Sequence, residues 1–292
     1  MASYLSTYQN VPFKRLTHLY ETVFGLHISE GSVSNMLNAM RRLSKKPYEM
    51  IRRKVADGKV AGADETGVNV NGINNWLWAF QNAVATYLAF DRSRSHKVVN
   101  RHFSPEELGG TVWVTDRWPA YFMGDVGMDD HQICIAHLLR NLTYTMQAFP
   151  DDAWSLDMLD LLRDSVHQRH KGHIGQDVRT RMEERLDELL ARPPVHTRED
   201  GKDTELDKLK KSIAKHRDHV FTFLTNPDVP PTNNDSEKAL RPAKTKLKVS
   251  GCFRTEAGVE NYAAVASVIQ TAVKNGQNPF EVLRVIATLA QV

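Results

Sequence analysis

The chain has 292 residues, of which 41% are hydrophobic and 25% are charged, so it can bury one large core or two smaller ones. Its longest apolar runs are far shorter than the roughly 18 residues of a membrane-spanning helix, and Met1 to Asn10 lack secretory-signal features, so we expect a cytoplasmic protein. Two cysteines exclude a disulfide framework, and a net charge of +3 permits nucleic-acid binding without requiring it.

The chain begins with a predicted pair of helices. Apolar residues at helical spacing predict a helix over 12–24 that ends at Gly25, and Ser29 fits the N-cap of a second helix that leads to Arg41 and Arg42. Such a pair is either a helix-turn-helix that touches DNA or a hairpin that packs on the next domain. We place the end of this N-terminal helical region at residue 58.

Strand patterns begin after residue 58. Residues 60–70 and 73–80 form two strand-like runs joined by Asn71-Gly72, the dipeptide best suited to a tight hairpin turn. A third strand is expected over 85–90, a helix over 95–102, a fourth strand over 111–115 and a fifth over 131–136. The helix before the fourth strand allows a crossover, so that strand can lie parallel to the first. The sequence therefore predicts an α/β domain over 59–292 with a mixed, helix-covered sheet.

Helical patterns dominate the rest of the chain. Amphipathic helices are expected over 138–149, 154–167, 178–191 and 206–224, with an exposed loop from Arg192 to Thr204. We interpret about 138–230 as a helical insertion within the domain. A last helical region starts at Asn234 and includes helices over 258–274 and 279–289.

Two aspartates lie where strands would bring them together. Asp64 lies inside a strand-like run, where a carboxylate is disfavoured, and Asp116 follows the fourth strand. Two adjacent carboxylates repel each other unless a cation lies between them, and oxygen ligands favour Mg²⁺ or Mn²⁺. The alternative for Asp116 is a turn-starting aspartate ahead of Pro119.

Glu237 has three interpretations that its pattern does not separate. It has capping-box spacing from Asn234 and ion-pair spacing to Arg241, and it can also be a third metal ligand in the first turn of a helix. A basic stretch follows it, either as solvated surface charge or as contacts to DNA phosphates, and it contains Arg241, Lys244, Lys246, Lys248 and Arg254.

Four blocks of sequence resemble the bacterial insertion sequence 66 transposase family in order and spacing. The first is Ala-Asp-Glu-Thr-Gly at 63–67 with Asn-Trp-Leu-Trp at 75–78, and the second is Thr-Asp at 115–116 with Ala-Tyr at 120–121. The third is Cys-Ile-Ala-His-Leu-Leu-Arg at 134–140, and the fourth is Pro-Thr-Asn-Asn-Asp-Ser-Glu-Lys-Ala-Leu-Arg-Pro at 231–242. The resemblance covers roughly residues 12–289.

This resemblance implies a ribonuclease-H-like fold in which Asp64, Asp116 and Glu237 bind two Mg²⁺ ions, with Asn234 as an accessory residue. It implies a transposase that cleaves DNA and joins its strands by metal-dependent phosphoryl transfer, acting on transposon ends and target DNA in the bacterial nucleoid. Synapsis of two ends implies at least a dimer on DNA. No covalent protein–DNA intermediate is expected.

Cys134 and His137 form a Cys-x-x-His pair that is similar to a motif of several transposase families. One interpretation is half of a zinc site, although structural zinc needs four ligands. The other is an accessory pair in which His137 touches a phosphate or orients a carboxylate beside the metal ions.

The sequence departs from the family pattern in places. Arg117-Trp118 replace the usual Gly-Tyr after Asp116, and Lys238 stands where arginine is usual. Relatives carry an N-terminal zinc-finger region that this sequence lacks, so we expect a truncated copy or a need for accessory proteins of the same element. A metal-dependent ribonuclease-H-like nuclease and a catalytically silent DNA-binding remnant are the alternatives to an active transposase.

Overall fold

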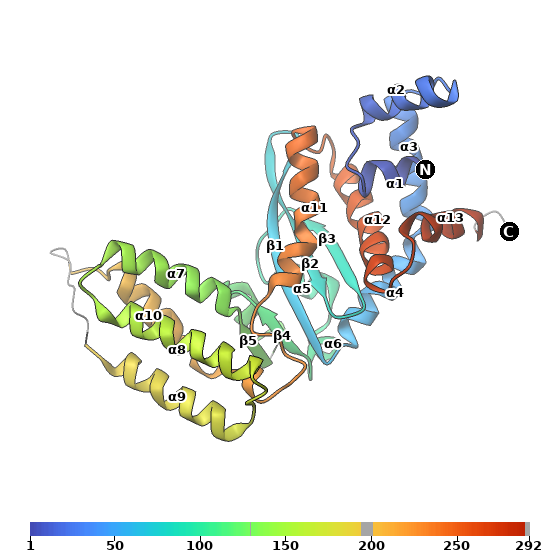
Figure 1. Cartoon of the computed structure of the whole chain (residues 1–292). Helices are drawn as coiled ribbons and strands as arrows, with labels where there is room; N and C mark the ends of the chain where they lie inside the picture. The colour runs from blue at the N-terminus through green and yellow to red at the C-terminus, as the bar shows by residue number, and fades with distance from the viewer. Residues whose placement is uncertain (129, 194–200, 290–292) are drawn as a thin grey trace. The chain divides into compact units, whose positions relative to one another are not determined.

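The computed structural model describes residues 1–128, 130–193 and 201–289 and divides the chain into two compact units (Figure 1). The first unit contains Met1–Thr111, Met123–Gly127 and the chain from Asn234 onward, and the second contains Val112–Phe122 and the chain from Met128 to Asn233. The N-terminal helices share a unit with the first strands. The expected insertion lies in the second unit.

The first unit contains an antiparallel meander of β1 (Val60–Val70), β2 (Ile73–Gln81) and β3 (Thr86–Asp91), which confirms the three strands predicted here. The β1–β2 turn has positive φ at Asn71 (48°) and Gly72 (86°), as the Asn-Gly pair predicts. The Gly72 N–H donates to the Asn69 side chain at 2.9 Å, which closes the turn. This hairpin fixes the register in which Asp64 lies opposite Ala79.

Helices α11 (Asn234–Ser250) and α12 (Glu256–Lys274) cover one face of the meander (Figure 1). Val68 and Val70 of β1 pack in this core with Leu77 and Leu88, and with apolar side chains of both helices. Alternate residues of a strand share a face, so the even-numbered positions of β1 point toward these helices. Asp64 is one of those positions.

Further helices complete the first unit. Helix α4 (Lys45–Ala56) packs on β3, where the Tyr48 hydroxyl donates to the Leu88 carbonyl at 2.6 Å. Two short helices, α5 (Lys97–His102) and α6 (Pro105–Leu108), follow the meander, and Arg52 of α4 is paired with Glu107 at 2.9 Å. Helices α1 (Ala2–Thr7) and α4 were not expected from the sequence pattern.

The N-terminal helix pair matches its prediction. Helix α2 (Phe13–Phe24) ends at Gly25, whose φ is 64°, and the Ser29 side chain caps α3 (Glu30–Leu43) by accepting from the Ser32 N–H at 3.0 Å. Leu16, Val33 and Leu37 form a small core between the two helices. The last described helix is α13 (Pro279–Leu289).

The second unit joins a parallel strand pair to a group of helices. Strands β4 (Val112–Thr115) and β5 (Asp130–Ile133) run parallel, and helices α7 (Ile135–Ala148), α8 (Ala153–His170), α9 (Gln176–Ala191) and α10 (Glu205–Lys215) follow them (Figure 1). The strand expected over 131–136 is shorter than predicted because α7 begins at Ile135. Part of the loop expected from Arg192 to Thr204, namely 194–200, lies outside the described residues.

The helix expected over 206–224 is wrong beyond Lys215, where two 3₁₀ turns, η2 (Arg217–His219) and η3 (Thr222–Leu224), replace it. The buried side chain of Gln132 on β5 explains this difference. Its amide donates to the Val220 carbonyl at 2.9 Å and accepts from the Phe223 N–H at 3.0 Å. Those backbone groups bond to a strand residue distant in sequence, which helical periodicity cannot foresee.

The described chain is thus a mixed α/β protein with five strands, antiparallel in the first unit and parallel in the second, flanked by helices. None of its described helices has the length and apolar character needed to cross a bilayer.

Candidate functional site

Asp64 lies near the middle of β1, on the face that α11 covers. It is half-buried, and it shares this face with Val68 and Val70 of the core. A carboxylate on the helix-covered face of a strand is expensive to desolvate unless other groups or a cation compensate it. The assignment of Asp64 as a metal ligand stays a prediction.

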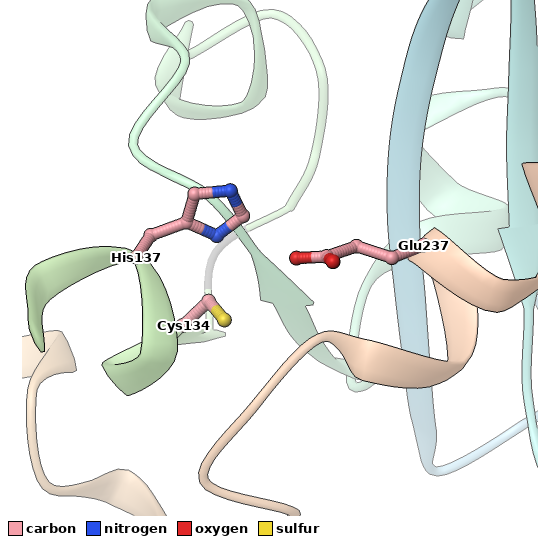
Figure 2. Close-up of side chains that lie close together, drawn as sticks. All are labelled: Cys134, His137 and Glu237. Atoms are coloured by element: carbon pink, nitrogen blue, oxygen red, sulfur yellow. The ribbon is translucent and has the colours of Figure 1, made fainter. Parts of the chain in front are cut away.

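Glu237 is half-buried in the first turn of α11 (Figure 2). The preceding residue, Ser236, is fully buried and its hydroxyl accepts from the Gln81 amide at 3.3 Å. Gln81 pairs with Gly62 on β1, two residues from Asp64 and on the same face. The first unit therefore brings the start of the Glu237 helix to the face of β1 that carries Asp64.

Glu65, the neighbour of Asp64, has a different role. Its side chain is 1% exposed and pairs with Arg94 at 2.7 Å, while the Arg94 guanidinium lies 4.6 Å from the Trp76 ring centroid. Glu65 is thus compensated on the opposite face of β1 from Asp64. Sequence reasoning did not single out this pair, because its partners are 29 residues apart and no local spacing connects them.

Asp116 follows β4 in the second unit and starts a turn. One carboxylate oxygen accepts from the Trp118 N–H at 2.9 Å, and the Thr115 hydroxyl donates to the Asp116 carbonyl at 2.8 Å. The turn-starting interpretation is therefore confirmed. It does not compete with metal binding, because a carboxylate accepts several hydrogen bonds or ligand contacts on its two oxygens.

Arg117 explains one departure from the family pattern. Its guanidinium donates to the Asn141 side chain of α7 at 2.7 Å and to the Ser212 hydroxyl of α10 at 2.9 Å. Burial lowers the pKa of Arg117 from its ordinary value, and the adjacent Asp116 opposes this shift. Arg117 therefore connects two helices of the second unit to the turn that holds Asp116.

Cys134 and His137 lie at the start of α7, one helical turn apart (Figure 2). The Cys134 N–H donates to the Thr115 carbonyl at 2.8 Å, and its buried sulfur accepts from the Asn233 N–H at 3.2 Å. The Ile135 N–H donates to the Pro231 carbonyl at 2.9 Å. The second unit therefore brings together the third motif, the residue before Asp116 and the beginning of the fourth motif.

The capping-box interpretation of Asn234 and Glu237 does not match the start of α11. Asn234 is exposed and is the first residue of the helix, so the residue in the N-cap position is Asn233, which is 2% exposed. Sequence reasoning missed Asn233 because two adjacent asparagines fit the cap position equally well.

Four of the five basic residues predicted to contact DNA are exposed. Arg241, Lys244 and Lys248 lie on one stripe of α11 that also includes Glu237, because these positions follow the helical repeat, and Arg254 is exposed beyond the end of the helix. A stripe of three cations that leads away from Glu237 suits contacts to the sugar–phosphate backbone.

The structure corrects the expectation for Lys246. Its side chain is buried against α1, where the ammonium donates to the Ser6 carbonyl at 2.9 Å and lies 5.9 Å from the Tyr262 ring centroid. Burial lowers the pKa of Lys246 to about 8. Lys246 therefore stabilises the packing of α1 and does not belong to the exposed basic stripe.

A mixed α/β fold with half-buried carboxylates and an exposed basic stripe is consistent with an enzyme that acts on nucleic acid. The family model described as "Transposase IS66 family" matches residues 2–261, and the chain belongs to that family. It therefore has the role of a transposase, and DNA is the partner that this role implies. No match was found among curated proteins.

Proposed function

We propose that this transposase cleaves phosphodiester bonds and joins DNA strands, with Asp64, Asp116 and Glu237 as the ligands of two Mg²⁺ or Mn²⁺ ions. The observation that carries the proposal is that the first turn of α11, which contains Glu237, contacts the meander on the face that carries Asp64, in a chain of this family. Asp116, which follows β4, is the remaining carboxylate of the set.

The donor chemistry fits the proposed ions. Three carboxylates supply hard oxygen ligands, which Mg²⁺ and Mn²⁺ prefer. When bound, such a metal pair activates a water or a DNA 3′-hydroxyl and stabilises the leaving oxygen of an in-line phosphoryl transfer. A ribonuclease-H-like arrangement of the strands belongs to this proposal.

The protein's own side chains have two further tasks in the proposed reaction. Arg241, Lys244 and Lys248 hold the DNA backbone beside Glu237 without reading sequence. His137 and Cys134, at the start of α7, act as accessory residues. Synapsis of two DNA ends requires at least two copies of the chain, so the proposed active form is a homo-oligomer on DNA. Accessory proteins of the same element are further proposed partners.

Asp64→Asn tests the proposal most directly. The substitution keeps the size of the side chain but removes the charge that holds the cation, so cleavage and joining should fall by at least about a thousandfold. The assay follows nicking and joining of a plasmid that carries the ends of the encoding element, in Mg²⁺ and in Mn²⁺. Asp116→Asn should lower both rates in the same way. It should also keep the turn folded, because asparagine retains the oxygen that accepts from the Trp118 N–H.

The matched control is Asp57→Asn, which changes an exposed aspartate at the end of α4 and should leave the rates unchanged. Joining that depends on Asp64 supports the transposase mechanism. Cutting without joining indicates a nuclease, and DNA binding without metal-dependent cutting indicates a silent remnant. Full activity of Asp64→Asn with folding intact would refute the assignment.

A further inference from the structure

A cleft of about 430 Å³ opens beside α11 in the first unit, lined by residues of α1, α11 and α12 and by the chain that follows α1. This volume lies within the range of about 300–1,000 Å³ that is typical of small-molecule sites. Lys238 and Arg241 line it from α11, so the cleft begins within one turn of Glu237. All of its lining residues belong to one compact unit.

Three polar atoms buried around this cleft lack a hydrogen-bond partner among the described residues. They are the Thr7 hydroxyl, the Asn10 side-chain amide oxygen (Oδ1) and the Tyr262 hydroxyl. Thr7 is 2% exposed and Tyr262 is 1% exposed. Unsatisfied buried polar groups are rare and costly, so these three groups favour a polar ligand that can reach them from the cleft.

The charge of the cleft favours an anionic group at its rim. Lys238 and Arg241 contribute two cations, and the ammonium of the buried Lys246 lies 5.9 Å from the Tyr262 ring centroid. Two acidic residues oppose them, namely Asp235, which is paired with Lys238 at 3.1 Å, and Glu237, one helical turn before Arg241. The ring of Tyr8, which is 41% exposed, also lines the cleft and is large enough for a base to stack on.

We propose that this cleft binds a single nucleotide of a DNA strand, with its phosphate on Arg241 and Lys238 and its base between Tyr8 and the buried polar atoms. The inference rests on the proposed function and deepens it. The bound nucleotide lies next to the phosphodiester presented to Glu237, so the cleft positions the strand for cleavage.

The test uses the full chain in EDTA, so that binding does not depend on the metal site. The probes are the four deoxynucleoside 5′-monophosphates, measured by isothermal titration calorimetry, and a 5′-phosphorylated single strand of about ten nucleotides, measured by fluorescence anisotropy. Wild-type protein should bind at least one monophosphate saturably and the strand more tightly. Arg241→Gln should weaken monophosphate binding about tenfold, because it removes a charge-assisted contact to the phosphate.

Two control variants remove the same positive charge at positions outside the cleft. Lys248→Gln lies on the same helix outside the cleft, so it should weaken binding of the strand but not of the monophosphate. Arg181→Gln, on an exposed position of α9, should change neither.

Tyr262→Phe tests the interior of the cleft. It should weaken monophosphate binding about fivefold and leave the melting temperature equal or higher, because the hydroxyl it removes has no partner among the described residues. Tyr144→Phe, at an exposed tyrosine of α7, is its control. Tyr8→Ala removes the exposed ring and should weaken binding of both probes without affecting the core.

No saturable monophosphate binding would mean that the cleft holds only water, and the inference would then be wrong. Binding that is indifferent to Arg241, Tyr8 and Tyr262 would also overturn it. If Asp64-dependent cleavage is found without monophosphate binding, only this inference fails. If Arg241-dependent monophosphate binding is found without cleavage in Mg²⁺ or Mn²⁺, the nucleotide site stands and the proposed strand-transfer chemistry fails.

Discussion

Neighbouring acidic residues of β1 have opposite surroundings. Glu65 is buried and paired with Arg94, whereas Asp64 lies half-buried on the face that leads to the start of α11. Burial of an acidic side chain is tolerated where a cation compensates it. Arg94 supplies that cation for Glu65, and a metal ion does so for Asp64 in the proposed function.

His137 provides a second test at the scale of the residue. If it touches the reacting phosphate or orients a carboxylate, His137→Ala should slow plasmid nicking by at least about tenfold while leaving the melting temperature nearly unchanged. The control is His167→Ala, at an exposed position of α8. Unchanged nicking rates in His137→Ala would exclude a functional role and leave a packing role.

The buried Lys246 makes stability depend on pH. Its pKa is lowered by burial from 10.5 to about 8 in the folded chain. Between pH 8 and 10 the unfolded chain keeps a proton that the folded chain has released, so the free energy of unfolding rises with pH. Burial also lowers the pKa of Lys274 to about 8, partly opposed by Asp235, and this residue adds to the same rise.

Each of the two lysines contributes at most about 3 kcal/mol to this rise in the free energy of unfolding. We therefore expect Lys246→Met to remove about half of the rise. Urea unfolding between pH 7 and 10 measures it. The window stops at pH 10 because the buried Tyr262, whose pKa is raised by burial, acts in the opposite direction above that. The exposed control Lys248→Met should retain the full rise.

Among the elements, the β1–β2 hairpin has the clearest local origin. Gly72 has a φ of 86°, and a Cβ there would meet no atom within 4 Å, so only the backbone conformation opposes a side chain. Gly72→Ala should therefore lower the free energy of unfolding by about 1 kcal/mol, as measured by urea denaturation.

Gly109→Ala is the matched control for the hairpin. Gly109 has a φ of −62°, and an added Cβ would make ordinary contacts at 3.8 Å. Gly109→Ala should therefore change the free energy of unfolding of the protein little. Equal effects of the two substitutions would show that backbone conformation does not explain the cost at Gly72.

Helix α11 combines three functions that local patterns only partly separate. Its buried face packs on the meander, its exposed stripe carries cations, and its first turn presents Glu237. Lys246 is only two residues from Lys248 but about 160° away around the helix by the helical repeat, so its side chain points to α1. The packing of α1 on this face of α11, which the local sequence of α11 does not record, decides that Lys246 is buried while Lys248 contacts water.

At the scale of the whole molecule, DNA binding should depend strongly on salt. Replacing the four exposed cations Arg241, Lys244, Lys248 and Arg254 with glutamine should make the slope of log K against log salt shallower, by about 0.9 for each phosphate that the variant no longer neutralises. Anisotropy titrations with duplex DNA in EDTA, over a series of KCl concentrations, measure the slope. Lys246→Met should leave it unchanged, and an unaltered slope in the fourfold variant would contradict the proposed DNA binding by these cations.

The sequence by itself determined most elements and the family. Period-two and helical patterns predicted the meander and most helices, because both depend on local alternation of apolar residues. The Asn-Gly turn and the Ser29 cap are also local effects of backbone conformation and hydrogen bonding, and both were confirmed. The four motif blocks indicated the insertion sequence 66 transposase family, and the match to the family model confirms it.

Only the tertiary structure decided how distant segments use their polar and charged groups. It placed the N-terminal helices in the unit of the meander, paired Glu65 with Arg94, ended α10 before the turns that bond to Gln132, and buried Lys246 against Ser6. It also gathered around one cleft three polar atoms that lack a partner among the described residues. Each of these arrangements joins residues far apart in the chain, where no local spacing records the partner.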